Sequence, residues 1–372
     1  MIQRRLIYRN FKIMKKYEQV QEWILDKIDK EGLAAGERLP GEISMAKELG
    51  VSRQTVRQAI SILEGQGMLT SIQGSGIYIG KREDIRKAKR KHRGRVAIIS
   101  TYLDDYIFPG TVRGMQSVLS EGGYQVNLFI TNNKVLSEKE ILEGIIEKDD
   151  LDGILAEAVK SSLPSPNLEL YRRLESMGVR VLFFNSFYPS LDLPCVRIDD
   201  TQSARDAVRM LINVGHKKIG GIFKADDGQG HLRYEGYVRA LSEAGIETLE
   251  ERVIWLDSVT YREFENMEDY ILKRLGDSTA VFCYNDELAY KLIEGCLKRG
   301  MEIPEDLSVV SIDNSYLSQI CHVPITSFTH PKEELGKEAA AKLIEMIESG
   351  KKGEDLVIKT RVCVRSSIAP AK

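Results

Sequence analysis

The 372-residue chain lacks a long uncharged apolar run. No segment approaches the eighteen or so apolar residues that a membrane-spanning helix needs. The stretch from Met1 to Met14 is basic and contains Ile, Leu and Phe, but it has neither a continuous apolar core nor a small-residue cleavage site. It is therefore not expected to be a secretory signal. We expect residues 1–15 to form a disordered N-terminal extension, unless Met14 is the true start of the protein.

Cysteine is scarce, and its spacing excludes the usual cysteine chemistry. The five cysteines are odd in number, scattered and free of any CxxC pair; they are Cys195, Cys283, Cys296, Cys321 and Cys363. Cys283 follows the apolar run 280–282, where a small core residue is expected. The pattern predicts neither a metal site nor disulfides, and it favours a reducing cytoplasm.

Catalytic signatures are also missing. The sequence contains no GxSxG, P-loop, HExxH or dinucleotide-binding fingerprint. Of the five histidines, His322 and His330 are close in sequence, but no third metal ligand accompanies them. We therefore expect no catalytic residues, no metal and no cofactor, and predict that the chain is not an enzyme. An enzyme acting on a carbohydrate stays open as an alternative, and it would need a paired acid and base.

The net charge of −2 conceals a strong asymmetry. Residues 1–95 contain 21 Lys and Arg against 11 Asp and Glu, whereas residues 96–372 contain 32 against 44. Such a split suggests a basic head that meets a polyanion and a body that does not. Charge alone does not distinguish DNA from an acidic membrane surface.

The first segment has the pattern of three helices and a hairpin. The expected elements are a helix over 17–30, a short helix around 43–49 closed by Gly50, a third helix from Arg53 to about Gln66 capped by Ser52, and strands at 68–72 and 77–79. This order is typical of a winged helix-turn-helix, predicted here for residues 16–80. Residues 81–94 follow as a basic linker, which is either a solvated charge run or an added attraction for phosphates.

From residue 95 the pattern changes to short apolar runs that alternate with helical stretches. The ten expected strands are 96–100, 125–131, 153–156, 181–185, 195–198, 219–223, 253–256, 280–284, 308–312 and 325–329. Expected helices between them include 111–121, 138–148, 167–177, 201–214 and 233–244. Apolar strands separated by helices predict an α/β fold with parallel sheets covered on both faces. Ten strands favour two similar lobes, with a ligand bound between them beyond the carboxyl ends of the strands.

The third helix of the head carries the densest signal for DNA binding. Its polar face begins at the helix N-terminus and consists of Ser52, Arg53, Gln54, Thr55 and Arg57, all residue types that contact phosphates or base edges. Arg57 lies one turn beyond Arg53 and is placed to address a guanine edge. The alternative is an ordinary amphipathic helix with a solvated outer face.

Residues 16–80 resemble the GntR type of winged-helix regulator. The resemblance is carried by Arg38-Leu-Pro, Val51-Ser-Arg-Gln-Thr-Val-Arg, Gln66-Gly and Gln73-Gly-Ser-Gly-Ile-Tyr. It implies that Lys16 and Glu42 lie at the DNA-facing edge, Arg53 and Thr55 at the backbone and Arg57 on the bases. It also implies that Gln73 and Gly74 form a wing tip reaching the minor groove. Tyr17 is interpreted as core packing.

Residues 95–372 resemble the LacI/GalR type of sugar-sensing regulator, which is similar to periplasmic sugar-binding proteins. The segments that carry this resemblance include Gly215-His-Lys-Lys-Ile-Gly, Arg233-Tyr-Glu-Gly-Tyr, Tyr284-Asn-Asp-Glu-Leu-Ala and Ile303-Pro-Glu-Asp-Leu. A head of the first type on a body of the second resembles the arabinose repressor family of Gram-positive bacteria. This family resemblance implies a repressor released from operator DNA by a sugar, with L-arabinose as the expected effector.

The resemblance also implies a set of effector-binding residues. Arg233 after the sixth strand, Asn285 after the eighth and Asp313 after the ninth correspond to positions that bind sugar hydroxyls. Further candidates at strand ends or crossovers are Asp105, Tyr106, Phe108, Glu157, Lys160, Asn185 and His330. Two alternatives stay open: Glu157 and Lys160 as a surface pair, and Phe108 as simple core. Asp226 and Asp227 are interpreted as turn caps.

These features predict a homodimer paired through residues 95–372, which binds double-stranded operator DNA and has no membrane partner. Alternatives are a different sugar, a sugar that acts as corepressor, and a carbohydrate-binding protein associated with transport. The missing signal peptide and the presence of residues 16–80 speak against the last of these.

Overall fold

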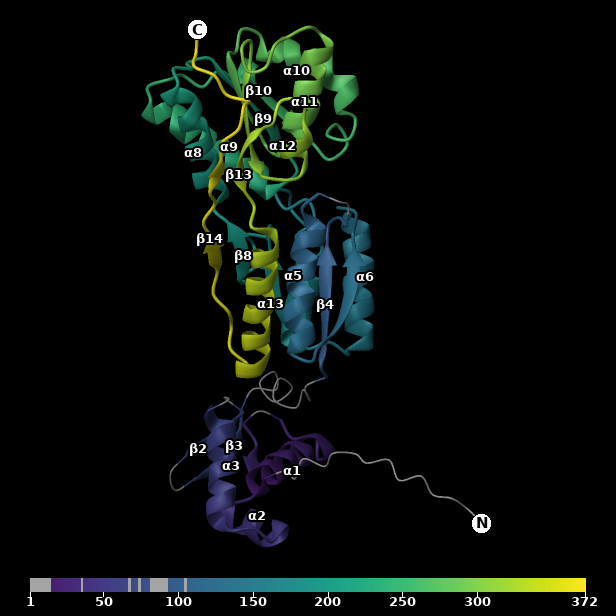
Figure 1. Ribbon diagram of the computed structural model, residues 1–372. Helices are drawn as coiled ribbons and strands as arrows, with labels where there is room; N and C mark the ends of the chain where they lie inside the picture. Colours follow the sequence, from purple (N-terminus) through teal and green to yellow (C-terminus); the bar gives the residue numbers. More distant parts are fainter. Residues whose placement is uncertain (1–14, 35, 66–67, 73–74, 81–92, 104–105) are drawn as a thin grey trace, which may run out of the picture. The chain divides into compact units, whose positions relative to one another are not determined.

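A computed structural model describes residues 15–34, 36–65, 68–72, 75–80, 93–103 and 106–372 of the chain (Figure 1). The chain divides into two units at His92 and Arg93, here called the head and the body.

The head has three helices and a small antiparallel sheet. The helices are α1 (Lys16–Lys30), α2 (Glu42–Leu49) and α3 (Arg53–Gly65), and the strands, in sheet order, are β1 (Arg38–Leu39), β3 (Gly76–Ile79) and β2 (Leu69–Ile72). Gly50 ends α2 with a φ of 64°, the left-handed conformation that favours glycine. The Ser52 hydroxyl accepts a hydrogen bond from the Thr55 amide at 3.1 Å, which caps α3. Both local predictions are confirmed, whereas the short strand β1 was not expected.

One face of each head helix packs into a common core. Val20 and Ile24 from α1, Met45 from α2, and Val56 and Ile60 from α3 are buried together. The apolar positions recur every three or four residues, so each helix presents one stripe to the interior. This order of elements, two helices followed by a turn, a third helix and a hairpin, is the winged helix-turn-helix arrangement that the sequence predicts.

The body consists of two lobes, each built on a six-stranded sheet (Figure 1). The first lobe contains, in sheet order, β14 (Leu356–Ile358), β8 (Cys195–Ile198), β7 (Arg180–Phe184), β6 (Gly153–Ala156), β4 (Arg95–Ser100) and β5 (Gln125–Ile130). Its helices are α5 (Phe108–Glu121), α6 (Val135–Lys148), α7 (Leu168–Ser176) and α13 (Lys332–Ser349). All the strand pairs of this sheet are parallel.

The second lobe contains, in sheet order, β10 (Val253–Leu256), β9 (Ile219–Lys224), β11 (Ala280–Cys283), β12 (Ser308–Asp313), β13 (Thr326–Thr329) and β15 (Val362–Cys363). Its helices are α8 (Asp200–Asn213), α9 (Gly228–Glu243), α10 (Phe264–Leu275), α11 (Asp286–Lys298) and α12 (Leu317–Ile320), with a short 3-10 turn at Glu250–Arg252. Only β15 among the described strands of this lobe runs antiparallel to its neighbour. The ten predicted body strands and the parallel α/β class are confirmed, and β14 and β15 are additions.

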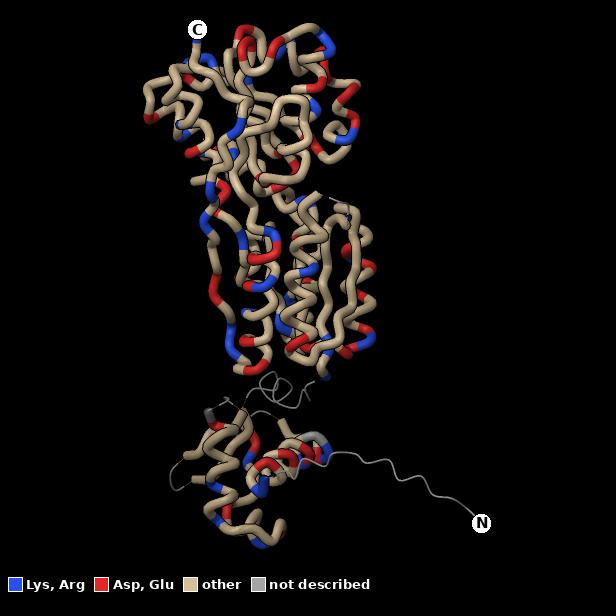
Figure 2. Tube along the Cα trace, in the orientation of Figure 1, with Lys and Arg blue, Asp and Glu red and all other residues tan. Residues whose placement is uncertain are grey.

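The chain passes between the lobes three times. The crossings lie between β8 and α8, between β13 and α13, and between β14 and β15. Acidic and basic positions are interspersed over both lobes (Figure 2). In the described part of the chain, no helix combines the length and apolarity needed to cross a bilayer.

Helices α5 and α13 of the first lobe touch backbone to backbone. A Cβ atom added to Gly114 would lie 2.2 Å from the Glu333 carbonyl oxygen, and one added to Gly336 would lie 2.1 Å from the Thr111 carbonyl oxygen. Side chains larger than a hydrogen atom are therefore excluded at this crossing. The two helices therefore pack with their backbones in direct contact.

Candidate functional sites

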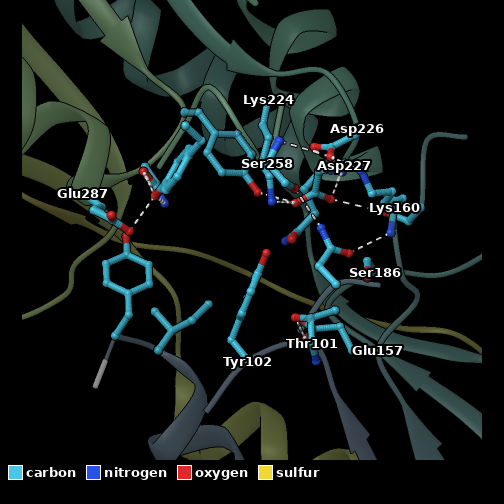
Figure 3. A pocket seen from close by; sticks show the side chains of 18 of the residues that line it. Thr101, Tyr102, Glu157, Lys160, Ser186, Lys224, Asp226, Asp227, Ser258 and Glu287 are labelled. Atoms are coloured by element: carbon cyan, nitrogen blue, oxygen red, sulfur yellow. Dashed lines mark hydrogen bonds and ion pairs between the residues drawn. The ribbon is translucent and has the colours of Figure 1, made fainter. Parts of the chain in front are cut away.

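A polar cavity of about 170 Å³ lies between the two lobes of the body (Figure 3). A cavity needs only ~10–15 Å³ of such volume to hold one water molecule, so this one has room for a small ligand. Its walls come from the ends of β4, β6, β9, β11 and β12 and from the loops that follow them. In parallel sheets, the carboxyl ends of the strands are where ligands bind.

Seven of the ten predicted effector-binding residues line this cavity. They are Tyr106, Phe108, Glu157, Lys160, Arg233, Asn285 and Asp313. Phe108 is half-buried and its ring meets Tyr102 edge to face at 5.6 Å, so it forms part of the wall as well as packing. Asp105 lies outside the described residues. Most of the predicted effector-binding positions therefore meet at one cavity, although they are spread over some 200 residues of sequence.

A buried ion cluster forms the floor of the cavity. The Arg233 side chain is 1% exposed; its Nε donates to Asp200 Oδ1 at 2.8 Å, and its Nη2 lies 3.5 Å from Asp313 Oδ1. Burial raises the pKa of Asp200 to about 6, against the opposing effect of Arg233. Burial alone would lower the pKa of Arg233, but the two carboxylates raise it. Arg233 therefore stays charged and holds Asp313 at the cavity.

Two tyrosines reach the floor from opposite sides. Tyr106, in the first lobe, donates its hydroxyl to Asp313 Oδ2 at 2.6 Å, a contact that crosses from one lobe to the other. Tyr261 donates to Glu287 Oε2 at 2.7 Å and receives a hydrogen bond from the Asn285 amide at 2.9 Å. These hydrogen bonds fix the orientation of the polar groups of the floor.

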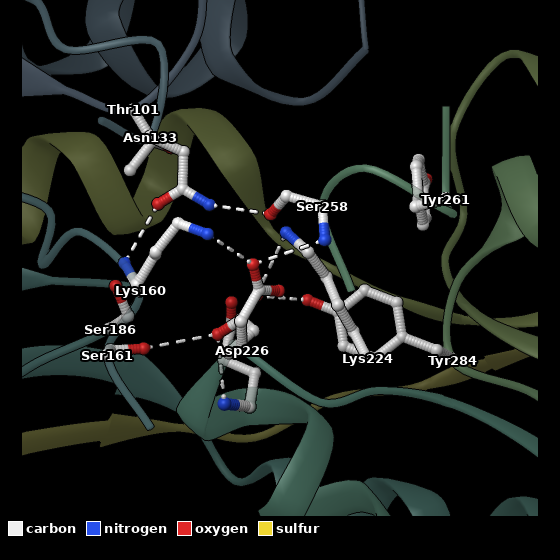
Figure 4. A network of polar contacts seen from close by, with 12 residues as sticks. Thr101, Asn133, Lys160, Ser161, Ser186, Lys224, Asp226, Ser258, Tyr261 and Tyr284 are labelled. Atoms are coloured by element: carbon white, nitrogen blue, oxygen red, sulfur yellow. Dashed lines mark hydrogen bonds and ion pairs between the residues drawn. The ribbon is translucent and has the colours of Figure 1, made fainter. Parts of the chain in front are cut away.

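A second set of polar contacts crosses the cleft between the lobes (Figure 4). Lys160 Nζ lies 3.2 Å from Asp226 Oδ2, and the Asn133 amide donates to the Ser258 hydroxyl at 2.9 Å. Although burial raises the pKa of Asp226, hydrogen bonds from Ser258 and the charges of Lys224 and Lys160 hold it below its usual value. Asp226 is thus ionised, and its Oδ1 atom has no hydrogen-bond partner among the described residues.

Glu157 and Lys160 do not form the surface pair that was one alternative. Glu157 is 4% exposed; it accepts hydrogen bonds from the Thr101 amide at 3.0 Å and from the Asn185 side chain at 2.9 Å. Burial raises the pKa of Glu157, in spite of these hydrogen bonds. The surface pair is therefore wrong, because Glu157 is buried and Lys160 pairs with Asp226 instead.

Asn185 and His330 do not line the cavity but lie buried behind its wall. His330 Nε2 is 3.0 Å from Asn185 Oδ1, and the Asn185 amide in turn holds Glu157. Since the Asn185 oxygen is an acceptor, the imidazole donates from Nε2. Burial lowers the pKa of His330 to about 4, so the ring is neutral near pH 7. These two residues position Glu157.

Several cavity residues were not predicted from the sequence. Asp227 caps α9, as expected, but it also accepts a hydrogen bond from Tyr284 at 2.5 Å and faces the cavity. Lys224 is 8% exposed, with its Nζ 3.9 Å from Asp227 Oδ2 and 5.8 Å from the Tyr261 ring centre. A lysine that ends an apolar strand is an unusual core residue, and this signal was available in the sequence. Tyr261 and Ser258 come from a loop that gives no such signal.

The cavity is close to electrically balanced. Its lining residues include five acids and four bases: Glu157, Asp226, Asp227, Glu287 and Asp313, with Lys160, Lys224, Arg233 and Arg262. Three of the acids are ion-paired across or along the cleft with Lys160, Lys224 or Arg233. This balance favours a neutral polar ligand over an anionic one.

In the head, α3 presents an exposed polar face. Its solvent side carries Arg53, Gln54, Arg57, Gln58 and Ser61. The side chains of Arg53 and Arg57 are 56% and 64% exposed, which leaves them free to reach a partner. The first three of these five residues were predicted from the sequence, whereas Gln58 and Ser61 were not.

Glu42 holds both arginines of this face. Its carboxylate accepts from Arg53 Nε at 2.7 Å and from Arg57 Nε at 3.0 Å. Burial raises the pKa of Glu42, but the two guanidinium groups together lower it by more than burial raises it. The pKa of Glu42 is therefore below its usual value. Because only Nε is used, the two terminal nitrogens of each guanidinium stay available for bidentate contacts.

The other predicted DNA-binding residues have different surroundings. Lys16 is exposed at the start of α1. Ser52 and Thr55 share a hydroxyl–hydroxyl contact of 2.8 Å at the α3 N-terminus, in addition to the cap. Gln73 and Gly74, the predicted wing tip, lie outside the described residues.

Two known families match separate parts of the chain. Residues 16–79 match the bacterial regulatory proteins of the gntR family, and residues 208–368 match the periplasmic binding protein-like domain. The first match covers the head, and the second covers most of the second lobe together with the C-terminal elements.

Two curated relatives are similar over nearly the whole chain. The arabinose metabolism transcriptional repressor of Halalkalibacterium halodurans is 37% identical over 96% of this chain and 97% of its own. The protein of the same description from Geobacillus stearothermophilus is 35% identical over 96% and 98%. A solved complex of the transcriptional regulator CelR with cellobiose has a TM-score of 0.66 and 26% identity, and covers 88% of this chain and 100% of its own. The chain therefore belongs to the family of the arabinose metabolism transcriptional repressors: it is a ligand-responsive repressor of sugar metabolism that joins a GntR-type head to a periplasmic-binding-protein-like body.

Proposed function

We propose that this repressor binds operator DNA through α3 and is released by L-arabinose bound in the cavity between the lobes. We assign DNA binding to residues 16–80, the connection to 81–94, and effector binding and dimerisation to 95–372. The observation that carries the proposal is the buried Arg233, which holds Asp313 at the floor of a balanced polar cavity. The identity of the sugar is supported by the two relatives named as arabinose metabolism repressors.

The cavity walls suit a small polyol. Each sugar hydroxyl donates one hydrogen bond and accepts others, so its site needs both carboxylates and cationic donors. Asp226 offers an unused acceptor at Oδ1, and Lys224 offers donors from an ammonium group whose ion pair is long. Tyr102 and Tyr261 supply aromatic faces beside Lys224. A neutral sugar satisfies these groups without adding charge to a balanced cavity.

The head suits a DNA groove. In our proposal, the Arg57 guanidinium contacts a guanine edge, and Lys16, Arg53, Gln54 and Thr55 contact phosphates at the helix end. Ser52 acts by capping α3, and Glu42 by holding the two arginines in place. Gln73 and Gly74 are proposed for the minor groove on the basis of the family resemblance.

We further propose that two copies pair through their bodies and present two α3 helices to a pseudo-palindromic operator. Sugar that alters the closure of the two lobes alters the geometry of this pair. The two sites share one coupling free energy. Operator DNA therefore weakens sugar binding by the same factor as the sugar weakens operator binding.

A thermal-shift screen over pentoses and hexoses, followed by a mobility-shift titration with the best ligand, tests the proposal. We expect L-arabinose to give the largest stabilisation and to dissociate the operator complex. An unchanged complex at saturating arabinose would refute arabinose as the effector. A complex that becomes tighter would refute induction and indicate a corepressor.

Variants separate the two halves of the proposal. Arg57→Ala is expected to weaken operator binding by about 5- to 150-fold, because a bidentate arginine–guanine contact is worth about 1–3 kcal/mol. The arabinose-induced thermal shift of this variant should equal that of the wild type. Arg172→Ala, which changes an exposed arginine of the body paired with Glu169, is the control and should leave both readouts unchanged.

A further inference from the structure

A second, larger hollow lies beside the polar cavity. It is a groove of about 500 Å³ between the lobes, bounded by the loops after β6 and β7 and by the first turn of α9. Its lining is largely apolar and includes Leu163, Pro164, Leu168, Phe187 and Leu232. The polar cavity and this apolar groove therefore lie side by side but offer opposite chemistry.

Three residues belong to both hollows and separate them. Ser161, Ser186 and Gln229 line the polar cavity and the apolar groove alike. Ser186 is fixed by its hydroxyl, which donates to the Ala158 carbonyl oxygen at 3.1 Å. Ser161 belongs to the first lobe and Gln229 to the second, so both lobes contribute to the boundary between the two hollows.

Direct hydrogen bonds between the lobes run along this wall. The Ser161 hydroxyl accepts from the Gly228 amide at 2.9 Å and donates to Asp227 Oδ1 at 3.3 Å. The neighbouring Ser162 hydroxyl donates to the Ala225 carbonyl oxygen at 2.7 Å. A ligand that extended from the cavity into the groove would break these contacts.

The wall is held from the cavity side by Lys160. This residue has a φ of 45°, in the left-handed region that non-glycine residues rarely adopt, and its ammonium group pairs with Asp226. Its backbone amide donates to Asn133 Oδ1 at 2.8 Å (Figure 4). The surrounding contacts thus fix an unfavourable backbone conformation, which indicates that the geometry at this point is specified.

We propose that Ser161 and Gln229 form a partition that limits the effector to a single sugar ring. The inference rests on the proposed function, because it concerns the same cavity, and it assigns size selectivity to residues outside the floor. In this proposal one sugar ring occupies the polar cavity of about 170 Å³. A glycoside with an apolar group has a matching groove next to the cavity but is kept from it by the partition.

The test compares the dissociation constants of L-arabinose and 4-nitrophenyl α-L-arabinopyranoside, measured by isothermal titration calorimetry on the full chain. The wild type is expected to bind the aryl glycoside at least a hundredfold more weakly than arabinose. Ser161→Gly removes the Cβ atom and the hydroxyl group of Ser161. It should reduce the ratio of the glycoside's dissociation constant to that of arabinose by at least tenfold. Gln229→Ala shortens the side chain that α9 contributes to the partition, and it should also reduce this ratio.

Ser258→Ala is the matched control. It removes a hydrogen bond between the lobes at a residue that lines the cavity but not the groove. It should change both dissociation constants by the same factor, which distinguishes an opened partition from loosened lobes. A wild type that binds the glycoside as tightly as arabinose overturns the proposal. The proposal is also overturned if Gln229→Ala leaves the ratio of the two dissociation constants unchanged and Ser161→Gly either leaves it unchanged or misfolds.

The two proposals fail in different ways. If the wild type binds another monosaccharide in place of arabinose, the proposed effector is wrong, and the partition is tested with that sugar and its 4-nitrophenyl glycoside. If the wild type binds no monosaccharide, both proposals are overturned.

Discussion

Replacing Arg233 by Met should destabilise the body strongly. Methionine keeps much of the side-chain volume but leaves Asp200 and Asp313, which are 1% and 2% exposed, without their buried cation. Removal of one partner from a buried ion pair costs about 3–5 kcal/mol. At about 2–4 °C per kcal/mol for a unit of this size, the melting temperature of the body should fall by roughly 10 °C.

Differential scanning calorimetry of the full chain measures this loss, and Arg239→Met is the control. Arg239 lies on the same helix, α9, but its side chain is 59% exposed, and its pair with Glu235 is a surface contact. Surface pairs contribute less than about 1 kcal/mol, so the control should melt within about 4 °C of the wild type. The Arg233 deficit should be larger at pH 8 than at pH 5, because protonation of Asp200 relieves its unpaired charge. If Arg233→Met melted like Arg239→Met, the ion cluster would not stabilise the fold as reasoned.

Two further predictions concern the body. The pKa of His330 is about 4 in the folded chain against about 6.5 when unfolded, so between these values the unfolded chain binds a proton that the folded chain does not. The contribution of His330 to the free energy of unfolding should therefore fall by about 3 kcal/mol from pH 7 to pH 4. His330→Gln, which keeps a donor for Asn185, should remove this contribution, so the difference in stability between wild type and variant in urea titrations should change with pH by about this amount; a difference that did not change with pH would disprove the assignment. Gly336→Ala places a Cβ atom 2.1 Å from the Thr111 carbonyl oxygen and should lower stability by about 1–3 kcal/mol, whereas Gly144→Ala, with open space on a helix, should raise it by up to about 1 kcal/mol. Thermal melts that showed the same sign for both alanines would contradict the packing argument.

Local patterns in the sequence were sufficient for the elements of the fold. A capped helix such as α3 is specified by Ser52 and the apolar positions that follow it, and a buried parallel strand such as β12 is specified by its own apolar run. The strand β14 was missed because its pattern is short and half-exposed, and its pairing partner β8 lies about 160 residues earlier in the chain. Such pairing depends on the assembled lobe and leaves little local trace.

The site was predictable where a polar residue ends a strand. Asn285 and Asp313 stand at strand ends, and the family resemblance that pointed to them also pointed to Arg233, which lies on α9; all three line the cavity. The roles of Asn185 and His330 were not accessible, because each contacts the other across 145 positions of sequence and neither reaches the cavity. A strand-end position identifies a residue near the cleft, but the fold decides whether its side chain faces the ligand or supports a neighbour.

The close crossing of α5 and α13 has a mechanical consequence. Both helices begin at the cleft: Tyr106 precedes α5 and bonds Asp313, and the Lys332 ammonium at the start of α13 donates to the Asp313 carbonyl oxygen at 3.1 Å. With 18 residues, α13 is about 27 Å long, and its far end approaches Arg180, whose strand begins beside Asp152 and the first residues of β4. The glycine contacts leave no room for side chains between the two backbones, so the helices pack as one continuous unit from the cleft to this far end. We therefore expect a displacement of Asp313 to shift both helices together and to reach the end of the lobe at which β4 begins.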